Sequence, residues 1–148
     1  MTDRLALRAL VDEYASAVDA RDADRFAGFF APDGVLAIIE PGDAQPSLTY
    51  TGHAELRTVM NLLRSYSATF HLMANHTCRV DGDAAEGEVY CLAHHLTQDD
   101  AGGAENTLMV IRYRDRYVRT DGEWRIERRD VLRQWTEYHA AELARLAT

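Results

Sequence analysis

The sequence predicts an α+β fold in which N-terminal helices pack on one face of a curved antiparallel sheet. Helical periodicity marks two stretches of the first 65 residues, and extended segments dominate from Phe70 onward. Turn signals at 81–83, 99–103 and 120–122 divide that second part into successive strands. Helices followed by a meander of strands indicate the α+β class. Such a sheet, wrapped around the first helix, makes a cone whose mouth can hold a small molecule.

Three helices are predicted, at Asp3–Ala20, Ala23–Phe30 and Ala54–Ser65. The first carries an apolar stripe at helical spacing, formed by Leu7, Leu10, Val11, Tyr14, Ala15 and Val18. Asp22 is the expected N-cap of the second helix, and the turn residues at 32–34 are expected to end it.

Strands are predicted at Val35–Ile39, Phe70–Val80, Ala84–Gln98, Glu105–Arg119 and Glu123–Trp135, with a short extended piece at Ser47–Thr51. The loop 41–46 is expected to rim an opening. After the last strand, Thr136 is expected to cap a C-terminal helix with His139 as its box partner.

Alternation in the last predicted strand breaks between Ile126 and Val131, so we expect a β-bulge near 127–129. The bulge would turn one of three basic residues inward: Arg128, Arg129 or Arg133.

Length and charge restrict the class of protein. The 148 residues fit one domain, 1–148, with one core. A net charge of −8 argues against nucleic acid and against anionic membrane surfaces as partners. The N-terminus lacks the pattern of a signal peptide, and no apolar run approaches a membrane span of about 20 residues. We therefore expect a cytoplasmic protein whose Cys78 and Cys91 are reduced and buried.

One face of the strand 84–98 is small and apolar up to a histidine: Ala85, Gly87, Val89, Cys91, Ala93 and His95. We expect this face to point into the cone, with His94 on the surface. The opposite face carries Glu86 and Glu88. These would form cross-strand ion pairs with the arginines on one face of the next strand, Arg112, Arg114 and Arg116.

The stretch 67–76 carries His71 within a largely apolar segment, at the point where a helix gives way to a strand. We interpret His71 as a general base in an apolar pocket, held by Asp19. Asp19 lies at the edge of the first helix's stripe, near the helix end where an acid is unfavourable to the dipole. Tyr14 and His95 have structural alternatives, as core residues with satisfied polar groups. No zinc-type spacing occurs, so neither a metal nor a cofactor is expected.

Several segments together resemble one family: 14–19, 29–34, 69–71, 80–84, 119–129 and 133–138. The chain resembles, over Arg4–Tyr138, the SnoaL-like proteins of the nuclear transport factor 2-like superfamily. The subgroup it resembles is that of scytalone dehydratase-like lyases, with bile acid 7α-dehydratase and hexachlorocyclohexane dehydrochlorinase. The resemblance implies the cone fold and a homodimer or homotrimer.

The resemblance also implies site residues. The family's His–Asp pair falls on His71 and Asp19, the tyrosine of the dehydratases on Tyr14, and the arginine of the dehydrochlorinase on Arg129. A polar residue of the middle strand matches His95. Expected substrate contacts are Val89, Cys91 and Phe70.

The function expected on this basis is a cofactor-independent dehydratase-type β-elimination on a small hydrophobic, cyclic, polyketide-like or steroid-like molecule. Two alternatives stay open: an isomerase or cyclase that uses the same base, and a non-catalytic binding or assembly subunit.

Overall fold

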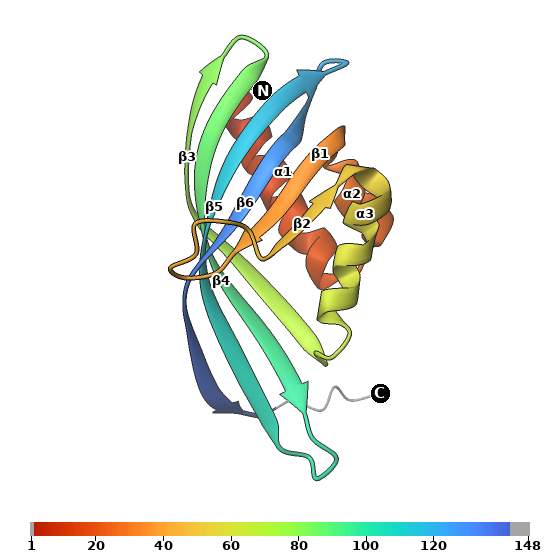
Figure 1. Cartoon of the computed structure of the whole chain (residues 1–148), viewed down its shortest axis with the longest axis vertical. Helices are drawn as coiled ribbons and strands as arrows, with labels where there is room; N and C mark the ends of the chain where they lie inside the picture. Colours follow the sequence, from red (N-terminus) through yellow and green to blue (C-terminus); the bar gives the residue numbers. More distant parts are fainter. Residues whose placement is uncertain (1, 143–148) are drawn as a thin grey trace.

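A six-stranded sheet curls around the N-terminal helices in the computed structural model, which describes residues 2–142 (Figure 1). The elements in chain order are α1 (Asp3–Asp19), α2 (Ala23–Gly28), β1 (Phe30–Ile39), β2 (Leu48–Thr51), α3 (Gly52–Thr58), the 3₁₀ helix η1 (Val59–Leu63), β3 (Ala68–Asp81), β4 (Ala84–Gln98), β5 (Ala104–Thr120) and β6 (Glu123–Ala141). The predicted α+β class and its curved sheet are confirmed.

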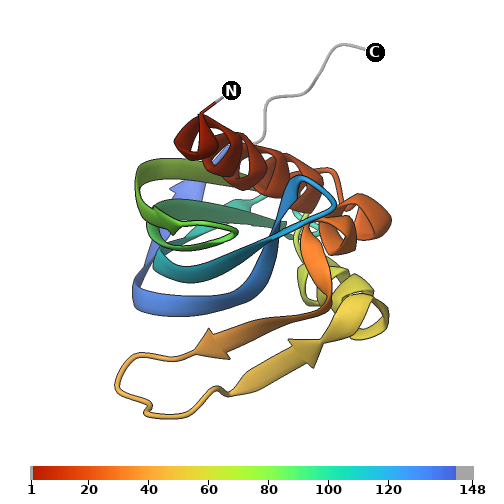
Figure 2. The ribbon, with the colours of Figure 1, turned by 90° about the horizontal axis from the view of Figure 1, so that it is seen from above.

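The strands lie in the order β2-β1-β6-β5-β4-β3. β3 to β6 form the predicted antiparallel meander, whereas β1 pairs with β6 in parallel. Seen from above, α1 lies across the open side of the curled sheet (Figure 2). Its apolar stripe is buried there, with Leu7 and Val11 fully inaccessible to solvent. The core therefore fills the space between α1, the short helices and the concave face of the sheet.

β6 contains the bulge that its sequence predicts. Arg116 of β5 pairs with Arg128 and Tyr117 pairs with Ile126, which leaves Glu127 as the extra residue. Before the bulge the even-numbered residues of β6, such as the buried Ile126, point inward. After it the odd-numbered residues do, and Arg129 is completely buried. A second shift leaves Gln134 unpaired between Arg133 and Trp135.

The predicted C-terminal helix is wrong over the described residues. β6 continues through Thr136 and pairs with β5 as far as Ala141, opposite Ala104. The reason is the length of β5. Its residues 104–109 form backbone hydrogen bonds with residues 136–141 of β6, and these partners would be lost if β6 stopped at Trp135. The rest of the predicted helix, 143–148, lies outside the described residues.

The segment 32–34 does not separate a helix from a strand, because β1 already begins at Phe30. The β1–β6 register shifts between Phe30 and Val35, so these turn residues form an irregularity within the strand. A side chain at Gly34 would lie 2.9 Å from the carbonyl oxygens of Ala31 and Ile126, which explains why glycine stands there.

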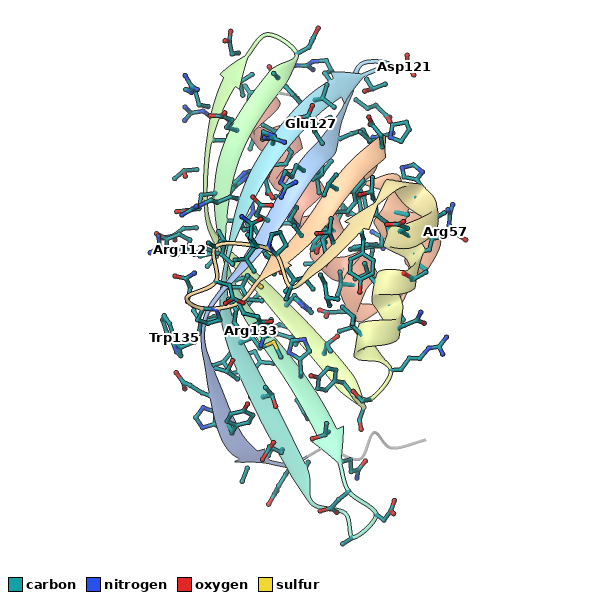
Figure 3. The ribbon with its side chains drawn as sticks, viewed as in Figure 1. Arg57, Arg112, Asp121, Glu127, Arg133 and Trp135 are labelled. Carbon is teal, nitrogen blue, oxygen red and sulfur yellow. The ribbon has the colours of Figure 1, made fainter. Side chains whose placement is uncertain are left out.

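One of the two ion pairs expected on the outer face of the sheet is present, since Glu88 lies 3.7 Å from Arg112 of β5. The other expectation is wrong, because Glu86 pairs with Arg79 of β3, at 3.2 Å, and not with an arginine of β5. Arg112 and Trp135 project from this face, away from the helices (Figure 3). Both cysteines are free thiols, Cys91 buried and Cys78 half-buried. None of the helices within residues 2–142 is long and apolar enough to cross a membrane.

Candidate active site

A cavity of about 270 Å³ lies between α1, η1 and the concave face of the sheet. Its polar lining includes His71, His95, Tyr14, Tyr66 and Tyr113. Its apolar lining is Val18, Phe26, Leu36, Ile38, Leu48, Val59, Leu62, Leu63, Met109, Ile111 and Val131, and one charged pair, Glu40 and Arg133, completes the wall. A few convergent polar groups in an apolar wall are the usual features of a small-molecule site.

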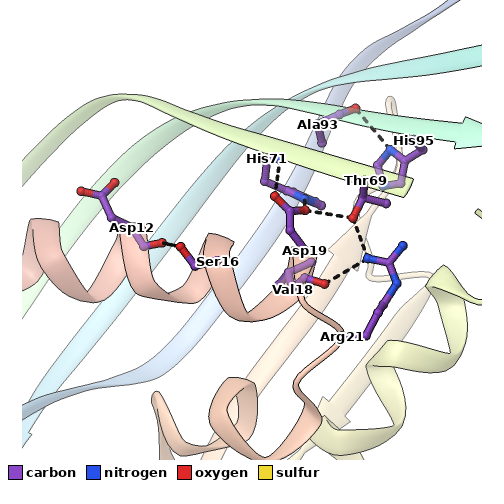
Figure 4. A network of polar contacts seen from close by, with 9 residues as sticks. All are labelled: Asp12, Ser16, Val18, Asp19, Arg21, Thr69, His71, Ala93 and His95. Atoms are coloured by element: carbon purple, nitrogen blue, oxygen red, sulfur yellow. Dashed lines mark hydrogen bonds and ion pairs between the residues drawn. The ribbon is translucent and has the colours of Figure 1, made fainter. Parts of the chain in front are cut away.

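His71 and Asp19 meet at the edge of this cavity. The Nδ1 atom of His71 lies 2.7 Å from Asp19 Oδ1, and the backbone N–H of His71 donates to Asp19 Oδ2 at 2.9 Å (Figure 4). The imidazole is nearly buried, with 7% of its side chain exposed, whereas the carboxylate is 25% exposed. A carboxylate at Nδ1 fixes the proton on that nitrogen, so Nε2 of the neutral ring keeps its lone pair.

Hydrogen bonds outweigh burial at Asp19. Burial raises the pKa of its carboxyl group, but the side-chain and backbone hydrogen bonds from His71, together with one from Thr69, bring that pKa below its ordinary value. Asp19 is therefore an anion at neutral pH, available to stabilise an imidazolium at His71.

Thr69 and Arg21 support the carboxylate from behind. Thr69 donates its hydroxyl to Asp19 Oδ1 at 2.9 Å and accepts from Arg21 Nη1 at 2.6 Å (Figure 4). Arg21 has a positive φ of 57°. It occupies the position after the C-cap of α1. The backbone N–H of Arg21 donates to the carbonyl oxygen of Val18, and the backbone N–H of Asp22 donates to that of Ala17. This is a Schellman ending, at which glycine is usual. The arginine accepts backbone strain there and places its guanidinium on Thr69.

His95 faces the same cavity as a neutral ring. Its centroid is 5.5 Å from that of His71 and 4.7 Å from that of Tyr66. Burial, reinforced by the neighbouring His71, lowers the pKa of His95 to about 4. Its Nδ1 bonds the carbonyl of Ala93 at 3.2 Å, so Nε2 is an acceptor. This arrangement does not suit the expected role of protonating a leaving group.

Tyr14 of α1 lines the cavity. Its ring packs edge-on to Tyr113, and burial raises the pKa of Tyr14 to about 12, so it remains a neutral donor. The guanidinium of Arg129 lies 4.1 Å from the Tyr14 ring centroid and 4.5 Å from that of Tyr113.

Arg129 does not line the cavity, although the resemblance suggests a charge for the departing group. It is 0% exposed and makes two hydrogen bonds, of 2.8 and 2.7 Å, to the buried carboxylate of Asp115. Tyr117 donates its hydroxyl to the same carboxylate at 2.5 Å. The positive charge is thus neutralised behind the two tyrosines, and Arg129 acts on the cavity only through the rings that it holds.

The comparisons with known proteins agree with this architecture. The profile of the SnoaL-like domain matches residues 1–130. The chain belongs to the SnoaL-like domain family. The chain is also similar to the uncharacterized protein Rv2910c of Mycobacterium tuberculosis, at 29% identity over 87% of this chain and 84% of the relative.

Two solved structures share the fold of this SnoaL-like domain. A hexachlorocyclohexane dehydrochlorinase (LinA) type 2 superposes with a TM-score of 0.79 at 23% identity, over 96% of this chain and 93% of the other. A scytalone dehydratase-like protein from Novosphingobium aromaticivorans superposes with a TM-score of 0.78 at 20% identity, over 98% and 95% of the two chains. A third solved structure, an NTF2-like protein with a cystatin-like fold from Novosphingobium aromaticivorans, superposes with a TM-score of 0.66 at 22% identity, over 88% of this chain and 81% of the other.

The expected substrate contacts do not fall on the cavity wall of the SnoaL-like domain. Val89 and Cys91 are buried as predicted, but they are packed in the core and are not part of the cavity lining. Phe70 is 61% exposed, because its neighbour His71 occupies the inward parity of β3. No three or more histidine, cysteine or acidic side chains meet in a metal-like group among residues 2–142.

Sequence reasoning missed Thr69, Arg21, Tyr66 and Glu40, and it named Arg133 only as one of three arginines that the bulge could turn inward. Thr69 had a signal, since it has the same inward parity in the strand as His71. Asp115 had one too, because it lies at inward parity between Tyr113 and Tyr117, and a buried acid there requires an inward cation.

Proposed function

We propose that this SnoaL-like domain is a cofactor-independent lyase in which His71 abstracts a proton next to a carbonyl group of a small apolar substrate. The observation that carries the proposal is the 2.7 Å contact between His71 Nδ1 and Asp19 Oδ1 at the edge of an apolar cavity. A positioned general base of this type contributes about 10²–10⁴-fold to a rate.

The reaction balances with the residues at hand. The C–H electron pair becomes the enolate and then the new C=C bond, while the proton goes to His71 Nε2. The bond from carbon to the leaving oxygen breaks, and that oxygen takes the proton back from His71 Nε2 to leave as water, which restores the neutral base. Asp19 stabilises the imidazolium in the meantime, as an oriented carboxylate does for histidine bases elsewhere.

Tyr14 supplies the hydrogen bond that the enolate or the leaving oxygen needs. Its pKa, raised to about 12 by burial, keeps the phenol protonated at neutral pH. A donor aimed at developing negative charge in a dry site stabilises the transition state more than it would in water. The shared fold with a dehydrochlorinase and a scytalone dehydratase-like protein supports elimination as the reaction class.

An isomerase is the second candidate, and His95 is the observation that favours it. Because its Nδ1 is engaged with Ala93 and its pKa is about 4, His95 offers no proton to a leaving group. A base that returns its own proton to another carbon needs no such acid. The two reactions differ in their products, since an elimination loses water and an isomerisation keeps the mass.

Proton abstraction can be measured without the natural substrate. Exchange of the α-protons of 1-indanone into D₂O, followed by NMR, reports on the base alone, and 3-hydroxy-1-indanone reports on loss of water through the absorbance of the indenone. We expect catalysed exchange in the wild type and a loss of about 10²-fold or more in His71→Ala. His139, exposed on β6, provides the matched control His139→Ala. Equal exchange by wild type and His71→Ala would refute the proposal.

A further inference from the structure

The cavity wall contains one ion pair, at a distance from the histidines. Arg133 Nη1 lies 3.0 Å from Glu40 Oε2, and both side chains line the cavity. Arg133 is the one arginine or lysine side chain in that lining, within the part of the chain that the structure describes. Its immediate surroundings include the apolar Ile38, Ile111 and Val131.

The first bulge of β6 turns Arg133 inward. Glu127 shifts the parity of the strand so that Arg129, Val131 and Arg133 share the concave side, and the unpaired Gln134 ends that run. Arg133 lies on β6 beside the loop that joins β1 to β2 (Figure 3).

Arg133 and His71 stand on different strands of the same concave surface. Arg133 pairs with Ile111 of β5, whereas His71 pairs with Ala93 of β4, which pairs with Met109. Three strand spacings separate β6 from β3, about 14 Å measured along the curled sheet. A molecule that lies along this wall of the cavity therefore has His71 toward one end and the pair toward the other.

The pair does not need its mutual contact for the fold. Arg133 and Glu40 are 30% and 33% exposed, and ion pairs with this much solvent contribute little net stability. They are therefore free to exchange part of that contact for a ligand.

The chemistry of the pair selects the ligand. Arg133 offers only donors and Glu40 only acceptors, so together they match a group that accepts and donates at once. A hydroxyl group does both. A ligand carboxylate would compete with Glu40 for the guanidinium and leave two anions side by side in a protein of net charge −8.

We propose that Glu40 and Arg133 form a hydroxyl-recognition subsite, so that the ligand is an apolar ring compound whose end away from His71 carries an alcohol or a phenol. The ligand's hydroxyl oxygen accepts from Arg133, and its proton is donated to Glu40. The assignment of this group as the distal end of a substrate rests on the proposed function. The subsite itself rests on the wall geometry alone.

Binding of three probes of the same shape tests the subsite: indane, 5-indanol and indane-5-carboxylate. Dissociation constants come from NMR titration of the methyl groups of Ile38 and Val131, which line the cavity. We expect 5-indanol to bind the wild type about tenfold tighter than indane, as one charge-assisted hydrogen bond provides. That ratio should fall to near one in Arg133→Gln and in Glu40→Gln, with indane binding unchanged as the check that the cavity is intact.

The matched control is Arg128→Gln. Arg128 lies on the same strand, is also 30% exposed and also pairs with an acid, Asp130, but it lies outside the cavity lining. This variant should keep the tenfold ratio. A ratio that survives in Arg133→Gln would overturn the proposal and leave the pair as a strap for the loop 41–46. Tightest binding of the carboxylate, dependent on Arg133, would overturn it in favour of an anion site.

Failure of the subsite can be told apart from failure of the lyase proposal. His71→Ala should retain the preference for 5-indanol, because His71 stands three strands away. Loss of α-proton exchange in that variant with the preference intact supports both ideas. Absence of catalysed exchange in the wild type would refute only the catalytic role.

Discussion

Asp19 receives two hydrogen bonds from one residue, His71, through the backbone N–H at 2.9 Å and through ring nitrogen Nδ1 at 2.7 Å. The backbone contact fixes the carboxylate relative to β3, so the ring contact does not depend on the mobility of α1. The two carboxylate oxygens therefore act on different groups. Oδ2 accepts from the backbone of β3, and Oδ1 orients the imidazole ring.

Replacing Asp19 by Asn should therefore impair catalysis more than folding. The amide oxygen can still accept from the backbone of His71, but its NH₂ group then faces Nδ1. The proton must move to Nε2, which removes the lone pair from the cavity. We expect α-proton exchange of 1-indanone to slow by about 10²–10⁴-fold with little change in melting temperature.

Asp12→Asn is the control on the same helix, because Asp12 is half-exposed and its ion-pair partner is the surface residue Arg8. It should leave the exchange rate unchanged. If Asp19→Asn and Asp12→Asn retained equal rates, the carboxylate would have no part in orienting the base.

Arg21→Gly should separate stability from activity. A residue other than glycine at φ 57° is strained, so glycine relieves strain, and we expect the free energy of unfolding to rise by about 0.5–1 kcal/mol. The same change removes the guanidinium that holds Thr69, and we expect exchange to slow by about tenfold. Urea unfolding and the NMR exchange assay give the two readings.

Asp121 provides the comparison, since it has a similar φ of 52° in the β5–β6 turn, far from the cavity. Asp121→Gly should raise stability by a similar amount and leave exchange as it is. An Arg21→Gly protein with wild-type exchange would show that Arg21 matters only to the helix end.

Much of the fold follows from local patterns. The alternation in 84–98 assigned the buried face of β4 correctly, and the broken parity of the last strand located the bulge at Glu127. The parallel pairing of β1 with β6 could not be predicted in this way, because a short apolar strand does not encode which distant strand it will join. The extension of β6 was missed for a related reason, since Thr136 matches a helix cap locally while β5 offers it a ladder.

The sequence predicted site residues only where a polar residue stands in an unusual local setting. An acid at a helix end and a histidine in an apolar segment pointed to Asp19 and His71, which the structure brings together. The position of Arg129 could not be judged without Asp115, whose burial turns an inward arginine into a neutral pair. The wall pair could not be read from the sequence, because the bulge at Glu127 turns Arg133 inward but nothing local indicates that Glu40, before the loop 41–46, would lie beside it.

Asp115→Asn should destabilise the protein strongly. Asp115 and Arg129 are both 0% exposed at the side chain, so removing one charge leaves the other buried without a counter-ion. We expect a loss of about 3–5 kcal/mol in urea unfolding. The double variant Asp115→Leu with Arg129→Met should recover most of it, since packed apolar side chains replace such pairs well.

The half-exposed pair of Arg128 and Asp130 gives the reference. Asp130→Asn should cost no more than about 1 kcal/mol, because solvent already screens that pair. Similar losses in Asp115→Asn and Asp130→Asn would mean that the buried pair is not a structural element of the core.

The last prediction concerns acid. Burial, and then the neighbouring His71, hold the pKa of His95 at about 4, against an ordinary value of 6.5. Between these two values the unfolded chain binds a proton that the folded protein refuses, so stability must fall as pH falls from about 6.5 toward 4. The contribution lost is roughly 2–3 kcal/mol. His95→Phe, which has nothing to protonate, should show a flatter decline of melting temperature over this range, whereas His139→Gln on the exposed end of β6 should follow the wild type. If the His95→Phe and wild-type curves ran parallel from pH 7 to pH 4, His95 would be titrating normally and burial would not be what keeps the ring neutral.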